Sequence, residues 1–247
     1  MSSASFSLND ELALVTGSAS GIGLATAQLF ERLGAKVLRA DLSYPGGLSE
    51  NKGTLTFGAD LRVAAEVEDL IRHCDEAFHG LHVIVNSAGI EMKGTVLDLS
   101  EESFDRVMET NLKSIFLVCK YGIPLLQKTS NRGSIINLSS DLGIQPIPGV
   151  DGYAASKGAI IALTKAMSKN WAKSGLRINC IAPGPIDTPL LARFQDPKIL
   201  DFLKENVLPL GRLGTPDEVA WAIAFLASGA SSLINGAVLT ANGGLVG

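Results

Sequence analysis

A glycine-rich turn stands between an apolar run and a helical segment near the start of this chain. Residues Thr16–Gly23 read TGSASGIG and continue the expected strand Leu12–Thr16. Glycines let the backbone turn sharply and approach a pyrophosphate, while the following helix offers unpaired N–H groups and the positive end of its dipole. The spacing G-x-x-x-G-x-G in this position therefore predicts a nucleotide-binding turn at the first strand of an α/β sheet.

The rest of the chain alternates short apolar runs with amphipathic segments. Further strands are expected at Lys36–Ala40, Leu55–Gly58, Leu81–Val85, Ser134–Leu138, Arg177–Ile181 and Ala237–Thr240. Helices are expected from the glycine turn to Leu33 and at Ala64–Phe78, Glu101–Gln127, Tyr153–Ala172 and Asp217–Ala227. Because several strands are continuously apolar, we expect a parallel sheet that is buried on both faces.

Composition narrows the function classes. The chain has 247 residues, 46% of them hydrophobic, and a net charge of -4 without a block of Lys or Arg. These values argue against nucleic acid or an anionic membrane as a partner. Cys74, Cys119 and Cys180 are scattered and odd in number, which indicates reduced thiols in a cytoplasmic protein. Residues 1–10 are Ser-rich and lack an apolar run, so we expect a flexible tail rather than a signal peptide.

Asp41 follows the second expected strand and bears on the choice of nucleotide. A carboxylate there can accept hydrogen bonds from both hydroxyls of an adenosine ribose, and it repels a 2′-phosphate. Arg39 lies on the same strand face and is a competing charge. Because no basic residue occurs within Ser18–Gly23 or directly after Asp41, we expect NAD(H) to be preferred over NADP(H).

Tyr153 and Lys157 lie four positions apart in the segment YAASK, so they share one face of an expected helix. A free tyrosine has a pKa of about 10 and is a poor base at neutral pH. An ammonium beside it favours the phenolate and lowers that pKa. The pair is predicted to be a tuned proton donor and acceptor, although the same spacing also occurs in solvated pairs.

The glycine turn and this pair together resemble the short-chain dehydrogenase/reductase family. The matching motifs, in chain order, are Thr16–Gly23, Asp60–Leu61, Asn86–Gly89, Asn111, Ser140, Tyr153, Lys157 and Pro183–Thr188. The resemblance implies that Tyr153 is the acid/base, that Lys157 lowers its pKa and binds the ribose, and that Ser140 holds the substrate oxygen. It also implies that Asn111 supports a water linked to Lys157. The neighbouring Ser139 points to the opposite face of its strand, and the family's spacing selects Ser140.

The resemblance also implies which residues bind the cofactor. They are Gly17, Ser20, Gly21, Ile22, Gly23, Asp41, Asp60, Leu61, Asn86, Ala88, Gly89, Tyr153, Lys157, Pro183, Gly184, Ile186 and Thr188. Thr188 and the backbone of Ile186 are expected at the nicotinamide carboxamide. One departure is Ser87, which stands where the family has a second Asn, and we expect only a small local change.

The implied fold is a single doubly wound Rossmann domain over residues 11–247. It has seven parallel strands in the order 3-2-1-4-5-6-7, and the cofactor lies at their carboxyl ends. The implied reaction is hydride transfer between NAD(H) and a secondary alcohol/ketone pair, with Tyr153 moving the proton. Two alternatives stay open: a sensor that binds NAD without turnover, and an epimerase or dehydratase that uses bound nicotinamide.

The substrate stays open among sugars, acyl thioesters, cyclic diols and aromatic ketones. Candidate pocket residues are Glu91, Leu142, Ile144, Gln145, Ile147, Val150, Pro185, Leu190, Leu191 and Phe194. No metal site is expected, because His73, His79 and His82 have no metal-binding spacing. Since the expected helices Glu101–Gln127 and Tyr153–Ala172 are apolar around much of their circumference, we expect a homotetramer.

Overall fold

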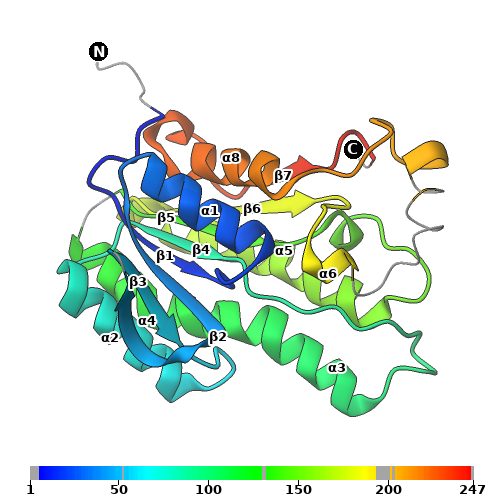
Figure 1. Cartoon of the computed structure of the whole chain (residues 1–247), viewed down its shortest axis with the longest axis horizontal. Coiled ribbons are helices and arrows are strands. Elements are labelled where there is room, and N and C mark those ends of the chain that lie inside the picture. The colour runs from blue at the N-terminus through cyan, green and yellow to red at the C-terminus, as the bar shows by residue number, and fades with distance from the viewer. Residues whose placement is uncertain (1–5, 52, 130–131, 193–200, 202–203, 246–247) are drawn as a thin grey trace.

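The computed structural model describes residues 6–51, 53–129, 132–192, 201 and 204–245. Within them, a seven-stranded sheet has the order β3-β2-β1-β4-β5-β6-β7 (Figure 1). The strands are β1 (Leu12–Thr16), β2 (Lys36–Asn51), β3 (Thr54–Gly58), β4 (Val83–Asn86), β5 (Ser134–Leu138), β6 (Arg177–Pro183) and β7 (Val238–Ala241). The predicted doubly wound fold and its strand order are confirmed.

Helices cover both faces of the sheet. The α-helices are α1 (Gly21–Arg32), α2 (Ala64–Phe78), α3 (Glu101–Met108), α4 (Ser114–Thr129), α5 (Asp151–Trp171), α6 (Pro189–Ala192) and α8 (Pro216–Ala227). Shorter helical turns lie at Glu109–Lys113 (π), and at Asp141–Gly143, Ala172–Ser174 and Gly229–Ser231 (3-10). No helix among the described residues is long and apolar enough to cross a membrane.

Successive residues of the central strand β1 face opposite layers of the core. Leu14 packs in the layer formed with α2, α4 and α5, whereas Ala13 and Val15 pack in the layer formed with α1 and α8. All three side chains are fully buried. Side chains alternate along a strand, so a strand covered on both faces must be apolar at every position, as β1 is.

The three cysteines are free and buried. Burial raises the pKa of the Cys74 and Cys119 thiols to about 12 and that of Cys180 to about 11. Thiols in such surroundings behave as small apolar side chains, and these three contribute packing to the core layer formed with α2, α4 and α5.

Strand β2 is longer than predicted and reaches 16 residues. Its residues 38–41 pair with 55–58 of β3 in ascending order, as parallel strands do. After a turn, residues 48–51 pair with 54–57 of β3 in the antiparallel sense. The prediction of purely parallel strands is therefore corrected at this edge, because the returning arm occupies hydrogen-bonding groups of β3 that would otherwise be open.

The predicted flexible tail is packed over its described part. Leu8 is 1% exposed, and its N–H donates to the carbonyl of Leu33 at the end of α1. The N–H of Asp10 donates to the carbonyl of Gly34. The ring of Phe6 lies 6.0 Å from that of Phe225 on α8. The segment was expected to be mobile because of its serines, but Leu8 buries enough apolar surface to hold it against the domain.

We predict that Leu8→Ala lowers the free energy of unfolding by about 2–5 kcal/mol, because it empties a buried leucine site. Urea denaturation followed by circular dichroism measures the change. The control is Leu97→Ala, since Leu97 is 95% exposed. Equal stability of the Leu8 variant and the control would mean that the segment is not part of the folded unit.

Candidate active site

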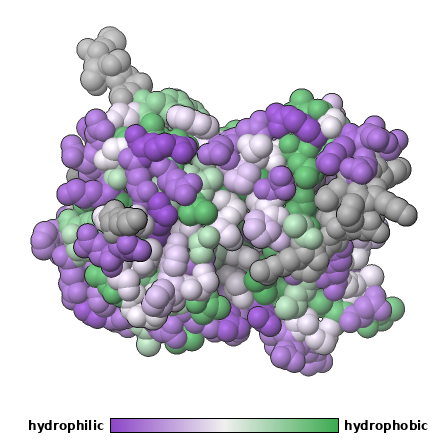
Figure 2. Space-filling view, viewed as in Figure 1, coloured by the Kyte–Doolittle hydropathy of each residue, from purple (hydrophilic) through white to green (hydrophobic). Residues whose placement is uncertain are grey.

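A cavity of about 1180 Å³ opens at the carboxyl ends of β1 to β6. Most of the predicted cofactor and catalytic residues line it: Gly17, Ser20, Gly21, Ile22, Gly23, Asp41, Asp60, Leu61, Ala88, Gly89, Ser140, Tyr153, Lys157, Pro183, Gly184, Ile186 and Thr188. Asn86 and Asn111 do not line it. Figure 2 shows a strip of apolar side chains in the right-hand half of the view, the side toward which the β6 arrow of Figure 1 points.

The glycine turn forms one wall of the cavity and leaves no room for side chains. Gly17 has a φ of +65°, and a Cβ on it would lie 2.7 Å from the backbone of Ala88. A Cβ on Gly23 would lie 2.1 Å from the carbonyl oxygen of Gly17. Ser20 precedes α1 without a side-chain cap, and the first turn of α1 carries no acidic residue. The N–H groups at the start of α1 therefore remain available to an anion, as the sequence predicted.

Asp41 at the end of the cavity is already hydrogen-bonded within the protein. Its Oδ2 accepts from the N–H of Ala19 at 3.1 Å, and its Oδ1 accepts from the N–H and the hydroxyl of Ser43 at 2.9 and 2.8 Å. Arg39 pairs with Glu31 at 2.6 Å and is thereby occupied outside the cavity lining. The carboxylate thus braces the glycine turn against the β2 arm.

A second charged pair lies at the same end of the cavity. Arg62 donates to both carboxylate oxygens of Asp60, at 2.9 and 2.6 Å. This hydrogen bonding lowers the pKa of Asp60. Arg62 was not among the predicted site residues, yet it lines the same cavity as Asp41 and Ser43. In the sequence, Arg62 is a basic residue in the turn after the third strand. The prediction of the nucleotide site considered only the ends of the first two strands.

The loop after β4 is fastened to the glycine turn. The hydroxyl of Thr16 accepts from the N–H groups of Ser87 and Ala88, at 3.1 and 3.4 Å. Asn86 lies beneath this loop, 2% exposed, and its Nδ2 donates to Oδ1 of Asn137 at 2.8 Å. Asn86 therefore does not line the cavity, and its expected place beside the cofactor stays a prediction. Ser87, the departure from the family motif, stands at the cavity instead.

The two adjacent serines after β5 have separate partners. The hydroxyl of Ser139 donates to the carbonyl of Lys157 at 2.7 Å and ties the strand to α5. The hydroxyl of Ser140 donates to Oδ1 of Asp141 at 3.0 Å and accepts from the N–H of Leu142 at 3.1 Å. Ser140 and Tyr153 both line the cavity, and the Ser140 hydroxyl is close enough to the phenol to lower its pKa. The choice of Ser140 over Ser139 as the serine of the site agrees with these contacts.

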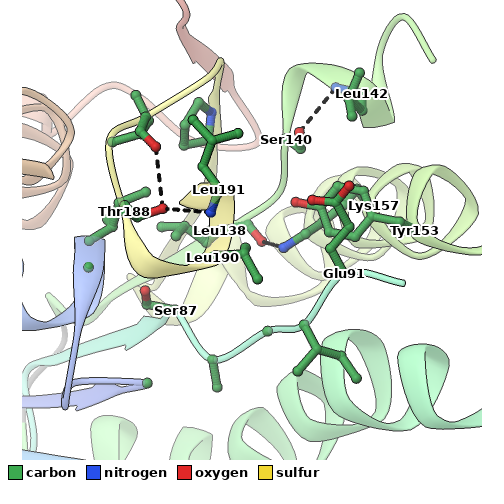
Figure 3. Close-up of a pocket in the computed structure, with 18 of the residues that line it drawn as sticks. Ser87, Glu91, Leu138, Ser140, Leu142, Tyr153, Lys157, Thr188, Leu190 and Leu191 are labelled. Atoms are coloured by element: carbon green, nitrogen blue, oxygen red, sulfur yellow. Dashed lines mark hydrogen bonds between the residues drawn. The ribbon is translucent and has the colours of Figure 1, made fainter. Parts of the chain in front are cut away.

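Tyr153 and Lys157 lie side by side on α5 at the cavity wall (Figure 3). The Nζ of Lys157 lies 5.5 Å from the centre of the Tyr153 ring and donates to the carbonyl of Leu138 at 3.0 Å. Burial lowers the pKa of Lys157 to about 8. Burial also raises the pKa of Tyr153, and the charge of Glu91 adds to that rise.

The predicted lowering of the Tyr153 pKa is wrong for the protein by itself. Spacing alone reveals a neighbouring ammonium but not the depth of burial, and desolvation of a phenolate opposes the attraction to that ammonium. Here desolvation is the largest contribution. In the protein without a ligand, the pKa of Tyr153 is therefore raised and that of Lys157 is lowered. A charged ligand that enters the cavity acts on groups that are already shifted in this way.

Asn111 sits in the π-helical turn that joins α3 to α4. Its Oδ1 accepts from the N–H of Ile90 at 2.8 Å, and its Nδ2 donates to the carbonyl of Ile90 at 2.9 Å and to the hydroxyl of Ser156 at 3.0 Å. It is fully buried and makes no direct contact with the cavity. Asn111 thus fixes the loop after β4 relative to α5, and insertions of π type are frequent at functional sites.

The segment after β6 closes the other side of the cavity. The hydroxyl of Thr188 donates to the carbonyl of Ile186 at 3.3 Å and accepts from the N–H of Leu191 at 3.4 Å. The predicted substrate-pocket residues that line the cavity are Glu91, Leu142, Gln145, Ile147, Val150, Pro185, Leu190 and Leu191. Ile144 does not line it, and Phe194 lies outside the described residues. Lining residues that the sequence did not single out include Lys93, Arg106, Val207, Leu208 and Leu245.

Comparison with known proteins gives consistent relatives over nearly the whole chain. A family model described as enoyl-(acyl carrier protein) reductase matches residues 17–246. A 3-oxoacyl-(acyl-carrier-protein) reductase of Thermotoga maritima is 37% identical, and the match covers 97% of this chain and 99% of the relative.

Two solved structures are similar in fold. The aldohexose dehydrogenase of Thermoplasma acidophilum, solved in ligand-free form, has a TM-score of 0.88 and 34% identity, covering 96% of this chain and 94% of the other. The 3-ketoacyl-(acyl-carrier-protein) reductase of Brucella melitensis, solved with NADH, has a TM-score of 0.88 and 29% identity, covering 97% of this chain and 99% of the other.

The expected preference for NAD(H) over NADP(H) is corrected by these relatives. The 3-oxoacyl-(acyl-carrier-protein) reductases point to NADP(H), whereas the solved Brucella protein holds NADH. The physical reason lies at the end of the cavity. The prediction counted only basic residues within Ser18–Gly23 and directly after Asp41, whereas Arg62, which is paired with Asp60, also lines the cavity.

We predict that Gly23→Ala weakens binding of the reduced nucleotide at least about tenfold, because the new Cβ pushes against the carbonyl of Gly17 and opens the turn. Titration of nucleotide fluorescence measures the dissociation constant. Gly229→Ala is the control, since a Cβ there meets nothing within 4 Å. Unchanged affinity of the Gly23 variant would exclude this turn as the nucleotide site.

Proposed function

This chain belongs to the short-chain dehydrogenase/reductase family, and from that premise we propose how its residues carry out the reaction. It is an NAD(P)-dependent oxidoreductase that acts on CH–OH or keto groups by hydride transfer. The observation that carries the proposal is the convergence of Ser140, Tyr153 and Lys157 on one cavity with the glycine turn.

The cavity fits a nicotinamide dinucleotide. Its volume of about 1180 Å³ exceeds the roughly 300–1,000 Å³ of common ligand pockets. The space beside Gly17 and Gly23 admits no Cβ, and the start of α1 offers free N–H groups. When bound, the dinucleotide supplies the hydride donor or acceptor. Ser20, Gly21 and Ile22 would hold the pyrophosphate, and Ile186 and Thr188 the nicotinamide end.

We assign the proton transfer to Tyr153. Its hydroxyl would donate a proton to the carbonyl oxygen as hydride reaches the carbonyl carbon, and would accept that proton in the reverse direction. Lys157, held by the carbonyl of Leu138, would supply positive charge beside the phenolate and a contact to the ribose. Overall, a ketone, NAD(P)H and a proton give an alcohol and NAD(P)⁺.

Ser140 would hold the substrate oxygen. Its hydroxyl already donates to Asp141 and accepts from the N–H of Leu142, so its orientation is set before substrate arrives. An orientation that needs no reorganisation is what stabilises developing charge on a substrate oxygen. Asn111 would act as a positioning residue, because its contacts run to Ile90 and Ser156 and fix the loop opposite the tyrosine.

A substrate panel tests the proposed function. Ketones and secondary alcohols are offered with NAD(H) and with NADP(H), and the absorbance of the reduced nicotinamide is followed. The names of the relatives suggest 3-oxoacyl groups and an aldohexose as two members of the panel. Stoichiometric nucleotide binding without turnover of any member would favour a sensor, and product without net change of nucleotide would favour an epimerase or dehydratase.

We predict that Tyr153→Phe lowers kcat at least about 10²-fold while leaving nucleotide affinity nearly unchanged, because it removes only the proton carrier. Single-turnover kinetics and nucleotide titration separate the two effects. Tyr121→Phe on α4 is the matched control, as Tyr121 does not line the cavity. A wild-type rate in the Tyr153 variant would remove this residue from the chemistry.

We also propose a homo-oligomer, most simply a tetramer, in the cytoplasm, acting on a small alcohol or ketone. A mostly apolar groove of about 480 Å³ supports the oligomer; it is lined by Met108, Glu109, Leu112, Lys113, Phe116, Ala159 and Leu163. Phe116 on α4, one of these residues, is 52% exposed. An aromatic ring left this exposed beside an apolar groove favours association. The three buried free thiols fit a reducing compartment.

We predict that Phe116→Arg reduces the mass in solution, because a charge replaces the apolar contact. Light scattering after gel filtration should give a multiple of 25.9 kDa for the wild type and a smaller mass for the variant. Leu97→Arg, at a more exposed position that does not line the groove, should keep the wild-type mass. A monomeric wild type would exclude this interface.

A further inference from the structure

Glu91 stands in the cavity without a role in the chemistry assigned above. It lies on the loop after β4, next to Ile90, whose N–H and carbonyl are both held by Asn111. This double hydrogen bond fixes the backbone from which the Glu91 side chain extends. In Figure 3 that side chain rises toward Tyr153 and Lys157.

The Glu91 carboxylate is partly buried, and it has no hydrogen-bond partner among the residues that the structure describes. Burial raises its pKa, and the charges of Lys93 and Lys157 oppose that rise. Among the described residues, no hydrogen bond to this carboxylate is formed. Asp141, the other acid of the cavity, already accepts from Ser140 and from the N–H of Leu142. Since an unpaired carboxylate in a partly buried site is costly, Glu91 has acceptor capacity that a ligand in the cavity can use.

The position of Glu91 determines which part of a substrate can donate a hydrogen bond to its carboxylate. The reacting oxygen is held by Ser140 and Tyr153, and Glu91 is close enough to Tyr153 for its charge to raise the pKa of the phenol. An ionised carboxylate only accepts hydrogen bonds. The remaining wall of this region is apolar and includes Leu142, Leu190 and Leu191. A substrate hydroxyl on the carbon next to the reacting carbon can donate to Glu91 while the reacting oxygen lies at Ser140 and Tyr153.

We propose that Glu91 is a specificity residue that selects substrates with a hydroxyl on the carbon adjacent to the reacting carbon, namely vicinal diols and 2-hydroxy carbonyl compounds. This inference rests on the proposed function of the same cavity. The carboxylate accepts the hydrogen bond of the neighbouring hydroxyl, and it disfavours anionic groups at that position. A compound that presents only hydrocarbon there leaves the partly buried carboxylate unpaired. Sites that are built to form a hydrogen bond with a substrate strongly reject analogues that lack the bonding group.

Matched pairs of ketones test the inference. Acetoin and butanone differ by one hydroxyl beside the carbonyl, and benzoin and deoxybenzoin form a larger pair with the same difference. Reduction is measured with NADH and with NADPH for the wild type and for Glu91→Gln and Glu91→Leu. Glu102→Gln is the control, because it removes an acid on α3 that is exposed and outside the cavity.

We expect the wild type to prefer the hydroxylated member of each pair at least about tenfold in kcat/KM. Glu91→Leu should abolish that preference, mainly through a higher KM for the hydroxylated ketone, since the lost interaction is one of binding. Glu91→Gln keeps an acceptor oxygen and should retain part of the preference. Glu102→Gln should behave as the wild type.

The dependence of the reaction rate on pH gives a second readout. A Glu91 side chain with only a structural role would not change it. Tyr153 faces the charges of Glu91, Asp141 and Lys157. Because the Glu91 carboxylate raises the pKa of the phenol, both Glu91 variants should shift the tyrosine limb of the pH–rate profile to lower pH. Glu102→Gln should leave it in place.

Two outcomes overturn the proposals separately. If the wild type reduces both members of a pair equally well, or if Glu91→Leu slows both members equally, Glu91 does not read a neighbouring hydroxyl and the proposed function stands. If the wild type turns over none of the four ketones, none of the matching alcohols and no member of the wider substrate panel with either nucleotide, the proposed function itself fails and the inference falls with it.

Discussion

The buried ammonium of Lys157 is the constraint on which the site depends. A cation at 5% exposure needs a fixed partner, and the carbonyl of Leu138 at the end of β5 provides it. The same junction is held from the other side, where Ser139 donates to the carbonyl of Lys157. A Cβ on Gly143 would lie 2.7 Å from the Lys157 backbone. Strand β5, the turn after it and α5 are thus locked together, and this lock sets where Tyr153 and Ser140 stand.

Most of the fold and much of the site could be predicted from the sequence, because the responsible signals are local. Continuous apolar runs predicted buried strands, and the glycine spacing predicted the turn at the start of α1, where a Cβ finds no room. The predictions failed where long-range contacts decide. Residues 48–51 of β2 fold back and pair with β3, and Leu8 hydrogen-bonds to the end of α1. Arg62 reaches the cavity from the turn after β3. The first two leave no local sequence pattern, and Arg62 stands beyond the two strands whose ends predict the nucleotide site.

Burial explains the remaining differences. Asn86 occupies its motif position but lies beneath the loop, because its amide is engaged by Asn137. The expected effect of Lys157 on Tyr153 followed from spacing, whereas desolvation and the acids of the cavity determine the pKa of the phenol in the protein. Glu91 was singled out only as a polar member of an apolar pocket. Its significance emerges from the absence of a protein partner within the described residues, which only coordinates reveal.

The burial of the three cysteines has a practical consequence. Oxidants and alkylating reagents attack the thiolate, and Cys74, Cys119 and Cys180 are held as neutral thiols by pKa values of about 11 to 12. The folded protein accordingly offers such reagents no good target near neutral pH. The rate at which iodoacetamide labels these thiols therefore reports how often the core opens, and so measures unfolding.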